Sequence, residues 1–453
     1  MDLEYIQNEY GLTPNELRTV QDAYTTFRNN TAPFMVSVAA EILDDLQEDV
    51  RLKGDDHRIA FLGRDGTSLH LAVRELDPDF HARHCANVTL SRAVAEAALQ
   101  DREKNEGRSF PDIETFRGAR NKVDPESVDF SHQRVQKMFQ RAGIPMGEPD
   151  SSVTLVDTSF KGTVQELLTE AYPETELTGR YAFLSKTPDD PRPEAKLGYV
   201  FHQEAGEKWS GFPSRSLSED PAETFGNQDA LGTIEETLHG PLDSPKGISP
   251  SGPVQRPQRE QTDPTEGINP NRVSEEYRSP KVREAVKVVA LDAVIDAARD
   301  SARKRDAGQD WRAELKDARR SYTSETRAWV AGRPTQDAHL TPLFDSFVRR
   351  ADKGLVKDLS RSLEGRELSP EALHRTWEAF GRAGDLESKK AYTDNVGATL
   401  AKSGAGHPAQ GSGTASATGN ASSDSASPAV PSFLQRSKTK GDEHGHGSGP
   451  SKK

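Results

Sequence analysis

Five short apolar runs, separated by polar loops and helical segments, set the pattern of the first 240 residues. These runs lie at residues 58–62, 86–90, 153–156, 180–184 and 197–201. Their length and their content of Val, Ile, Leu and Phe are typical of buried strands. Between them, apolar residues recur at every third or fourth position, as in helices that pack on a sheet. The pattern predicts an α/β domain with a parallel sheet of about four to six strands.

The composition of the chain changes after residue 240, which gives a domain division. Residues 1–240 form the predicted α/β domain with its N-terminal helices. Residues 241–280 are rich in proline and poor in large apolar side chains, which predicts a linker or an ordered excursion. Residues 281–402 show helical periodicity, which predicts a small helical bundle or a helical extension packed on the α/β domain. Residues 403–453 are mainly Gly, Ser, Ala, Thr and Pro, so we expect a disordered tail.

One stretch inside the predicted α/β domain does not follow its alternation of strands and helices. Residues 101–130 are charged and are interrupted by Pro111 and Pro125. They predict a cap or mobile flap over a site, or a solvated excursion.

Charge and composition exclude several classes of protein. The formal net charge is −13, whereas a general nucleic-acid binder needs clustered Lys and Arg to neutralise phosphates. The single cysteine, Cys85, excludes an internal disulfide framework and a Cys-rich zinc site. The first residues carry acids where a secretory signal has positive charge, and no apolar run approaches the ~20 residues of a membrane span. We expect a cytoplasmic protein that does not enter a membrane.

Polar, charged residues follow three of the predicted strands. Arg64-Asp65-Gly66 follows the first strand, Ser91-Arg92 the second, and Asp157 with the polar stretch 158–163 the third. In an open parallel sheet, ligands bind beyond the carboxyl ends of the strands. We therefore expect the three loops to converge, with Asp65 and Asp157 at the same edge of one sheet.

The first loop offers groups suited to phosphate. Arginine makes bidentate contacts with phosphate, so Arg64 is a candidate phosphate ligand. Asp65 could orient Arg64, hold a metal ion or accept a proton from a hydroxyl group. An Arg–Asp pair that only fixes a turn is the structural alternative. Gly66, Ser91 and Arg92 complete the candidate phosphate-binding residues of the first two loops.

The third loop lacks two known phosphate signatures. It does not have the glycine and Lys-Ser/Thr spacing of a P-loop. Ser159 stands where a haloacid-dehalogenase phosphatase has its second aspartate. The loop resembles that of phosphoribosyltransferases, in which the acid meets ribose hydroxyls and loop amides hold the 5′-phosphate, although Thr158 replaces the usual second acid. By this resemblance Asp157 is the acid, and the phosphate-binding candidates are Thr158, Ser159, Lys161, Gly162 and Thr163.

A second resemblance covers residues 32–250. The segments APFMVSVAAEIL, RIAFLGRDGTSL, VTLSRAVAEAAL, VTLVDTSFKGTVQELL and IEETLHGPLDSPKGI occur in this order. They are similar to the RDG-motif domain of bacterial proteins linked to surface polysaccharide and glycosyl transfer, which is often next to a haloacid-dehalogenase-like domain. The resemblance implies a phosphoribosyltransferase-like fold and places Glu235 and Glu236 at the periphery of the site.

Together these patterns predict a protein that binds a phosphorylated sugar or nucleotide, with transfer or hydrolysis left open. Asp65 and Asp157 are the candidate catalytic residues and the candidate ligands of Mg²⁺. The alternative is a non-enzymatic interaction protein with a degenerate site, whose helical half, residues 281–402, recruits a protein partner. A phosphatase is a third hypothesis.

Overall fold

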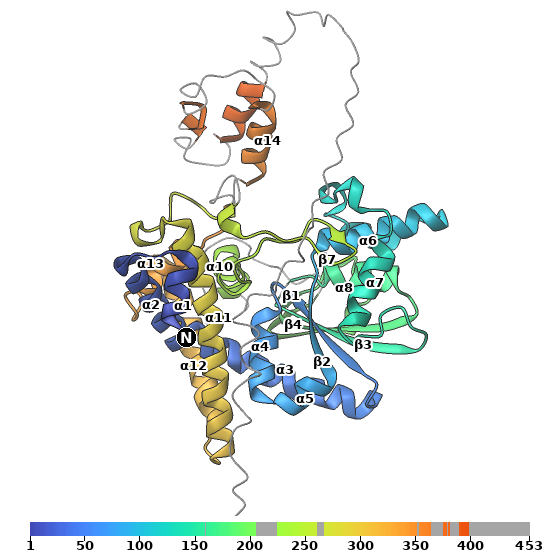
Figure 1. The fold of residues 1–453 in the computed structure, drawn as a ribbon, viewed down its shortest axis with the longest axis horizontal. Helices are drawn as coiled ribbons and strands as arrows, with labels where there is room; N and C mark the ends of the chain where they lie inside the picture. The colour runs from blue at the N-terminus through green and yellow to red at the C-terminus, as the bar shows by residue number, and fades with distance from the viewer. Residues whose placement is uncertain are drawn as a thin grey trace, which may run out of the picture. The chain divides into compact units, whose positions relative to one another are not determined.

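The computed structural model describes residues 1–158, 160–204, 224–260, 267–350, 353–363, 375–377, 379–380 and 389–397. Figure 1 shows how its helices and strands are arranged. The predicted disordered tail, residues 403–453, lies outside the described residues.

Five parallel strands form the central sheet, in the order β2-β1-β3-β4-β5. They are β1 (Arg58–Gly63), β2 (Cys85–Thr89), β3 (Ser151–Asp157), β4 (Thr175–Ser185) and β5 (Lys196–Gln203). Each predicted apolar run overlaps one of these strands, so the predicted parallel α/β class is confirmed. The runs are nearly continuous because helices cover both faces of the sheet.

The order of the strands reverses between β1 and β3. From β1 the chain goes to β2 on one side, and then returns past β1 to form β3 on the other side. Phe61 of β1 lies opposite Val156 of β3, so the two strands end at nearly the same level. Such a reversal opens a crevice at the carboxyl ends of the two strands, where α/β proteins bind their ligands.

Helices cover the two faces of the sheet. On one face, α6 (Arg92–Glu106), α7 (Ser131–Arg141) and α8 (Thr163–Ala171) enclose a core with inward residues of β1 and β3, among them Leu62 and Leu155. The other face carries α3 (Thr31–Lys53), α4 (Thr67–Leu76) and α5 (Pro78–His84) (Figure 1).

The later helices extend the second layer. They are α10 (Gln228–Leu238), α11 (Pro280–Asp306), α12 (Trp311–Val330), α13 (Leu340–Asp345) and α14 (Lys353–Leu363). The long helix α11 packs on α3, α4 and the N-terminal helix α2 (Pro14–Asn29), while α12 packs on α3. The first helix of the chain is α1 (Leu3–Tyr10). Of the two predicted arrangements, residues 280–330 therefore form an extension packed on the α/β part.

Residues 101–130, predicted as a cap, a mobile flap or a solvated excursion, are mostly exposed but are anchored in the core at a few positions. Helix α6 continues to Glu106, and the chain then makes three short 3₁₀ turns, η1 (Pro111–Phe116), η2 (Arg120–Lys122) and η3 (Pro125–Ser127). Ile113 and Phe116 are buried in the core beside α6 and α8. The sequence did not indicate this packing, because the apolar anchors are widely spaced in an otherwise charged stretch.

The proline-rich segment that follows α10 is also ordered where the structure describes it. It contains the short antiparallel pair β6 (Ile248–Ser249) and β7 (Gly252–Pro253). Further 3₁₀ turns are η4 (Pro193–Ala195), η5 (Gln258–Glu260) and η6 (Glu275–Tyr277).

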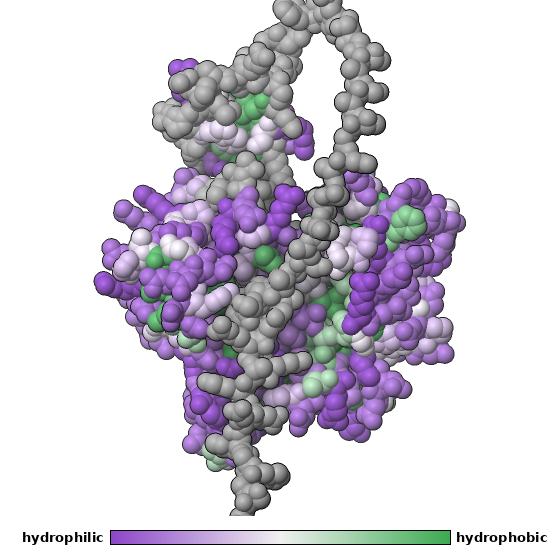
Figure 2. All heavy atoms as spheres, viewed as in Figure 1, coloured by the Kyte–Doolittle hydropathy of each residue, from purple (hydrophilic) through white to green (hydrophobic). Residues whose placement is uncertain are grey.

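The face of the molecule in Figure 2 is mostly hydrophilic, with scattered apolar residues. Among the described residues, no helix combines the length and the apolar character needed to cross a membrane.

Candidate functional site

The carboxyl ends of β1, β2 and β3 bring the three predicted loops to one edge of the sheet. Asp65 follows β1, and Asp157 is the last residue of the parallel neighbour β3. The predicted placement of the two acids at the same edge is confirmed. We call the described residues of the three loops, 63–66, 90–92, 157–158 and 160–163, the strand-end site.

Gly66 holds the first loop tightly against the sheet. Its amide donates a hydrogen bond to the Leu62 carbonyl oxygen at 2.7 Å. A Cβ atom at Gly66 would lie 2.8 Å from the carbonyl oxygens of both Leu62 and Val156. Only glycine allows this approach, so the loop that carries Arg64 and Asp65 is seated directly on the ends of β1 and β3.

Burial and neighbouring charges change the acidity of Asp157. Burial raises the pKa of Asp157 well above its ordinary value, and the negative charges of Asp65 and Glu235 raise it further. The Thr158 amide, which donates to Asp157 Oδ1 at 2.7 Å, and the Arg92 guanidinium act in the opposite direction. Asp157 therefore holds its proton more strongly than an exposed aspartate, and a bound cation would favour the ionised form.

Two helices begin at the site without a side-chain cap. The N-cap residues of α4 and α8 are Gly66 and Gly162, and neither start has a capping side chain. By contrast, Ser91 caps α6 by accepting a hydrogen bond from the Val94 amide at 3.1 Å. Thr158, 1% exposed, has a buried hydroxyl oxygen without a hydrogen-bond partner. Uncapped amides at helix starts favour anions.

The loop after β3 rests on a buried ion cluster that the sequence reasoning missed. Gly162 has φ +69°, and a Cβ atom there would lie 2.6 Å from Cε of Lys196. The Lys196 ammonium pairs with Glu166 and Asp190, each at 2.5 Å. Lys161, in the same loop, is exposed. The buried Lys196 thus packs against the loop at Gly162, whereas Lys161 of the same loop is accessible to solvent.

The remaining predicted residues take different positions. Arg92 is exposed at the first turn of α6, and Thr163 begins α8. Ser159 lies outside the described residues.

Helices α10 and α11 bring a second charged group to the site. His239 follows α10, and its Nδ1 atom lies 4.0 Å from Asp65 Oδ1. The buried Lys287 of α11 donates to Glu236 Oε1 at 2.5 Å, to His239 Nε2 at 3.1 Å and to Gln258 Oε1 at 2.6 Å. Asp65 Oδ1 and His239 Nδ1 are both buried and without a hydrogen-bond partner.

This group has a defined protonation pattern. Burial and the positive charge of Arg64 lower the pKa of His239 to about 3, so the ring is neutral at pH 7. The Nε2 atom of the ring lies 3.1 Å from the Lys287 ammonium and 3.4 Å from Glu236 Oε1, and the Nδ1 atom faces Asp65. Burial opposes ionisation of Glu236, but the positive charge of Lys287 outweighs it and holds the Glu236 pKa well below its ordinary value.

The two glutamates that the family resemblance singled out form buried ion pairs here. Glu235 pairs with Arg349 at 2.5 Å, and Glu236 pairs with Lys287. Both glutamates are at least nine-tenths buried. They join α10 to the segment after α13 and to α11, next to the strand-end site.

Residues 239–258, which we call the covering segment, lie across the first two loops. Arg64 Nη1 donates to the Leu242 carbonyl oxygen at 2.9 Å, and Ser91 Oγ donates to the Pro245 carbonyl oxygen at 2.5 Å. Ile248 is 2% exposed and belongs to the core beside α6 and α7. In this conformation, two of the predicted phosphate donors bind the chain's own backbone.

Sequence reasoning missed the partners that come from distant parts of the chain, namely His239, Gln258, Lys287 and Arg349. Lys287 did have a local signal, because it interrupts an apolar run between Val286 and Val288 in a helix that is otherwise apolar at this level. A lysine in such a run is normally paired inside the protein.

The donor set can be compared with the needs of a metal ion. Among the described residues, no group of three or more His, Cys, Asp and Glu side chains could hold a metal. Mg²⁺ is often bound by one or two carboxylates together with waters and substrate phosphates. The strand-end site offers two carboxylates, those of Asp65 and Asp157, which is fewer than such a group of three.

Comparison with known proteins adds no assignment to this geometry. No protein-family model and no curated protein matches the chain.

Proposed function

We propose that the strand-end site binds a phosphorylated sugar or nucleotide. The observation that carries the proposal is the position of Asp65 and Asp157, which follow neighbouring parallel strands where the strand order reverses. The uncapped starts of α4 and α8 lie at the same edge and supply amide donors for a phosphate. A crevice at this point of an open α/β sheet is the usual place for such a ligand.

The site residues then have separate roles. Arg64 and the exposed Lys161 contact phosphate, together with the amides that follow Gly66 and Gly162. Asp65 and Asp157 hold Mg²⁺ or sugar hydroxyls, and Mg²⁺ would neutralise phosphate charge. If the bound molecule is transferred or hydrolysed, stabilisation of developing negative charge by Arg64 and Lys161 is the main catalytic effect.

Calorimetric titration of the full chain tests this proposal. The panel contains nucleotides, sugar nucleotides and phosphoribosyl pyrophosphate, each with and without MgCl₂. We expect at least one member to bind, and Asp157→Asn to weaken its binding by about tenfold or more, as for loss of a charged contact in a buried site. Asp189→Asn is the control, because this aspartate is exposed and lies between β4 and β5. Absence of binding across the panel, or equal binding by Asp157→Asn, would refute the proposal.

One observation favours the second candidate function, a non-enzymatic interaction protein that recruits a protein partner through residues 281–402. Arg64 and Ser91 already donate to the covering segment, as expected for a site that has lost its ligand. Affinity capture with the full chain and with Arg64→Ala separates the two functions. A partner retained equally by both proteins, together with a silent ligand panel, supports the interaction protein. Ligand binding that is weakened in Arg64→Ala supports the strand-end site.

A further inference from the structure

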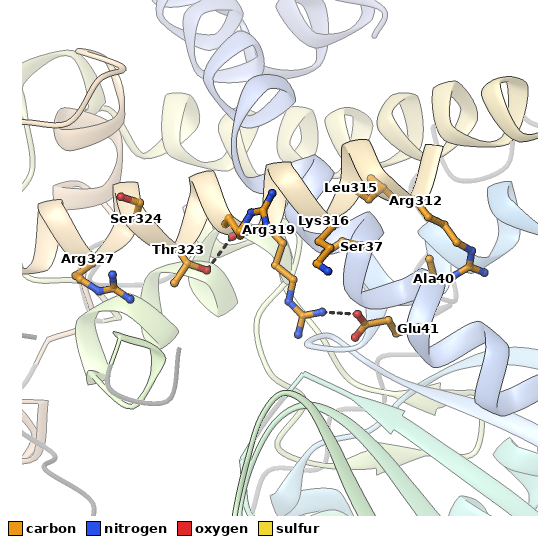
Figure 3. Close-up of a pocket in the computed structure, with 11 residues that line it drawn as sticks. Ser37, Ala40, Glu41, Arg312, Leu315, Lys316, Arg319, Thr323, Ser324 and Arg327 are labelled. Atoms are coloured by element: carbon orange, nitrogen blue, oxygen red, sulfur yellow. Dashed lines mark hydrogen bonds and ion pairs between the residues drawn. The ribbon is translucent and has the colours of Figure 1, made fainter. Parts of the chain in front are cut away.

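A basic groove lies between α3 and α12, away from the strand-end site (Figure 3). Its volume is about 630 Å³. Five of its lining residues are cationic, against one acid, Glu41, in a chain whose net charge is −13. The cationic residues are Arg312, Lys316, Arg319, Arg320 and Arg327. The groove therefore concentrates positive charge against the trend of the whole chain.

The cations share one helix. Residues three or four positions apart lie on the same side of a helix, and Arg312, Lys316, Arg319 and Arg320 follow this spacing. Figure 3 shows Arg312, Lys316 and Arg319 extending from α12 toward the side of the groove that α3 forms. The hydroxyl groups of Thr323 and Ser324 continue this lining along α12.

Arg319 joins α12 to the neighbouring elements α3 and β5. Its guanidinium binds Glu41 of α3 at 2.7 Å and the Tyr199 carbonyl oxygen of β5 at 2.6 Å. It is therefore held between a helix and the edge strand of the described sheet. The strand-end site follows β1 and β3, and β4 separates β3 from β5. The groove and the strand-end site are thus different places on the molecule.

Three of the cationic side chains, those of Lys316, Arg320 and Arg312, are exposed and available to a ligand. Lys316 is exposed and makes no ion pair with any residue that the structure describes. Arg320 and its partner Asp317 are 70% and 68% exposed. Arg312 pairs with Asp44 at 2.8 Å, and both side chains are half exposed. Such exposed pairs contribute at most about 1 kcal/mol, so a more highly charged anion can replace the carboxylates.

These features select one class of ligand. Guanidinium groups bind two oxygens of a carboxylate or of a phosphate at once. Linked phosphates carry more charge than an isolated carboxylate, so a cluster of cations favours them. The volume lies within the roughly 300–1,000 Å³ of small-molecule sites. The residues that line the groove include no aromatic side chain, and single-stranded nucleic acids usually need one for base stacking. We propose that the groove binds a compact polyanion with several linked phosphate groups, independently of the strand-end site.

Titration of the full chain with inorganic tripolyphosphate, at low and at moderate NaCl, tests the proposal. We expect saturable binding that weakens as salt rises, because the contacts are ionic and exposed. The double variant Lys316→Ala/Arg320→Ala should bind about tenfold or more weakly. Lys137→Ala, which removes an exposed lysine of α7, is the matched control and should bind like the wild type. Circular dichroism establishes that each variant is folded.

Three further titrations distinguish binding of linked phosphates in the groove from other ways of binding an anion. Orthophosphate, with one phosphate, should bind much more weakly than tripolyphosphate, and so should a hexa-aspartate peptide. Asp157→Asn should leave tripolyphosphate binding unchanged, which distinguishes the groove from the function proposed above. Absence of saturable binding, equal binding by the double variant, preference for the peptide, or loss of binding in Asp157→Asn would each overturn the proposal.

Discussion

Replacement of Gly66 by alanine should disturb the strand-end site through packing alone. Gly66 has φ −75°, which alanine adopts freely, so no backbone strain is introduced. The added Cβ would stand 2.8 Å from the carbonyl oxygens of Leu62 and Val156, and ordinary contact begins at 3.4 Å. The loop must therefore move by about 0.6 Å, which is 3.4 Å less 2.8 Å, because the ends of β1 and β3 cannot yield. We expect a loss of about 1–3 kcal/mol in the free energy of unfolding, as for other overpacked sites.

Urea unfolding followed by far-UV circular dichroism measures this loss. Gly118→Ala is the matched control, because nothing lies within 4 Å of a Cβ atom there. At a position that accepts alanine, the same substitution is neutral or stabilising by up to about 1 kcal/mol. If the Gly66→Ala protein unfolds at the same urea concentration as the control, Gly66 is not seated on the strand ends as described here.

Three further predictions concern the charges and the segment around the site. Lys287→Met should cost about 3 kcal/mol in urea unfolding, because the buried Glu236 loses its nearest cation and keeps only the more distant Arg349, at 3.7 Å, and adding Glu236→Gln should recover part of the loss. Burial, then the charge of Lys53, lowers the pKa of His57 from 6.5 to about 4. Between these pH values the unfolded chain takes up a proton at His57 and the folded chain does not, so the free energy of unfolding should fall as pH drops from 6.5 to 4. The fall should be smaller in His57→Gln. Equal slopes of unfolding free energy against pH in the two proteins would contradict this. Ile248→Ala should make the covering segment the first site of limited proteolysis, while an unchanged cleavage pattern would show that Ile248 is not its anchor.

The strands of the sheet could be predicted from the sequence because each is a short, nearly continuous apolar run. Residues 153–156 are buried on both faces, and a strand covered on both sides needs a continuous apolar run. The loop after that run, with Asp157 at its start, could then be placed at the carboxyl edge. The placement of Asp65 and Asp157 at the same edge followed from the expectation of one parallel sheet. The pairing of β1 with β3 was not predicted and is a finding of the structure.

The charged residues that α10 and α11 bring to the site could not be predicted from the sequence. His239 and Lys287 are almost fifty positions apart in the sequence, and only the packing of α10 and α11 brings their side chains to 3.1 Å. The contact of Arg64 with the Leu242 carbonyl oxygen spans 178 positions of the sequence, and backbone acceptors carry no sequence signal. The basic groove was missed because the net charge of −13 averages over a local cluster on α12.

The strand-end site is tested most directly by hydrogen exchange of the full chain with and without the ligand that titration identifies. We expect slower exchange for the amides that follow Gly66 and Gly162, at the starts of α4 and α8, because those amides bind the phosphate. We also expect faster exchange near Leu242, because the ligand takes Arg64 away from the covering segment. Protection confined to other elements, with the starts of α4 and α8 unchanged, would contradict the central claim.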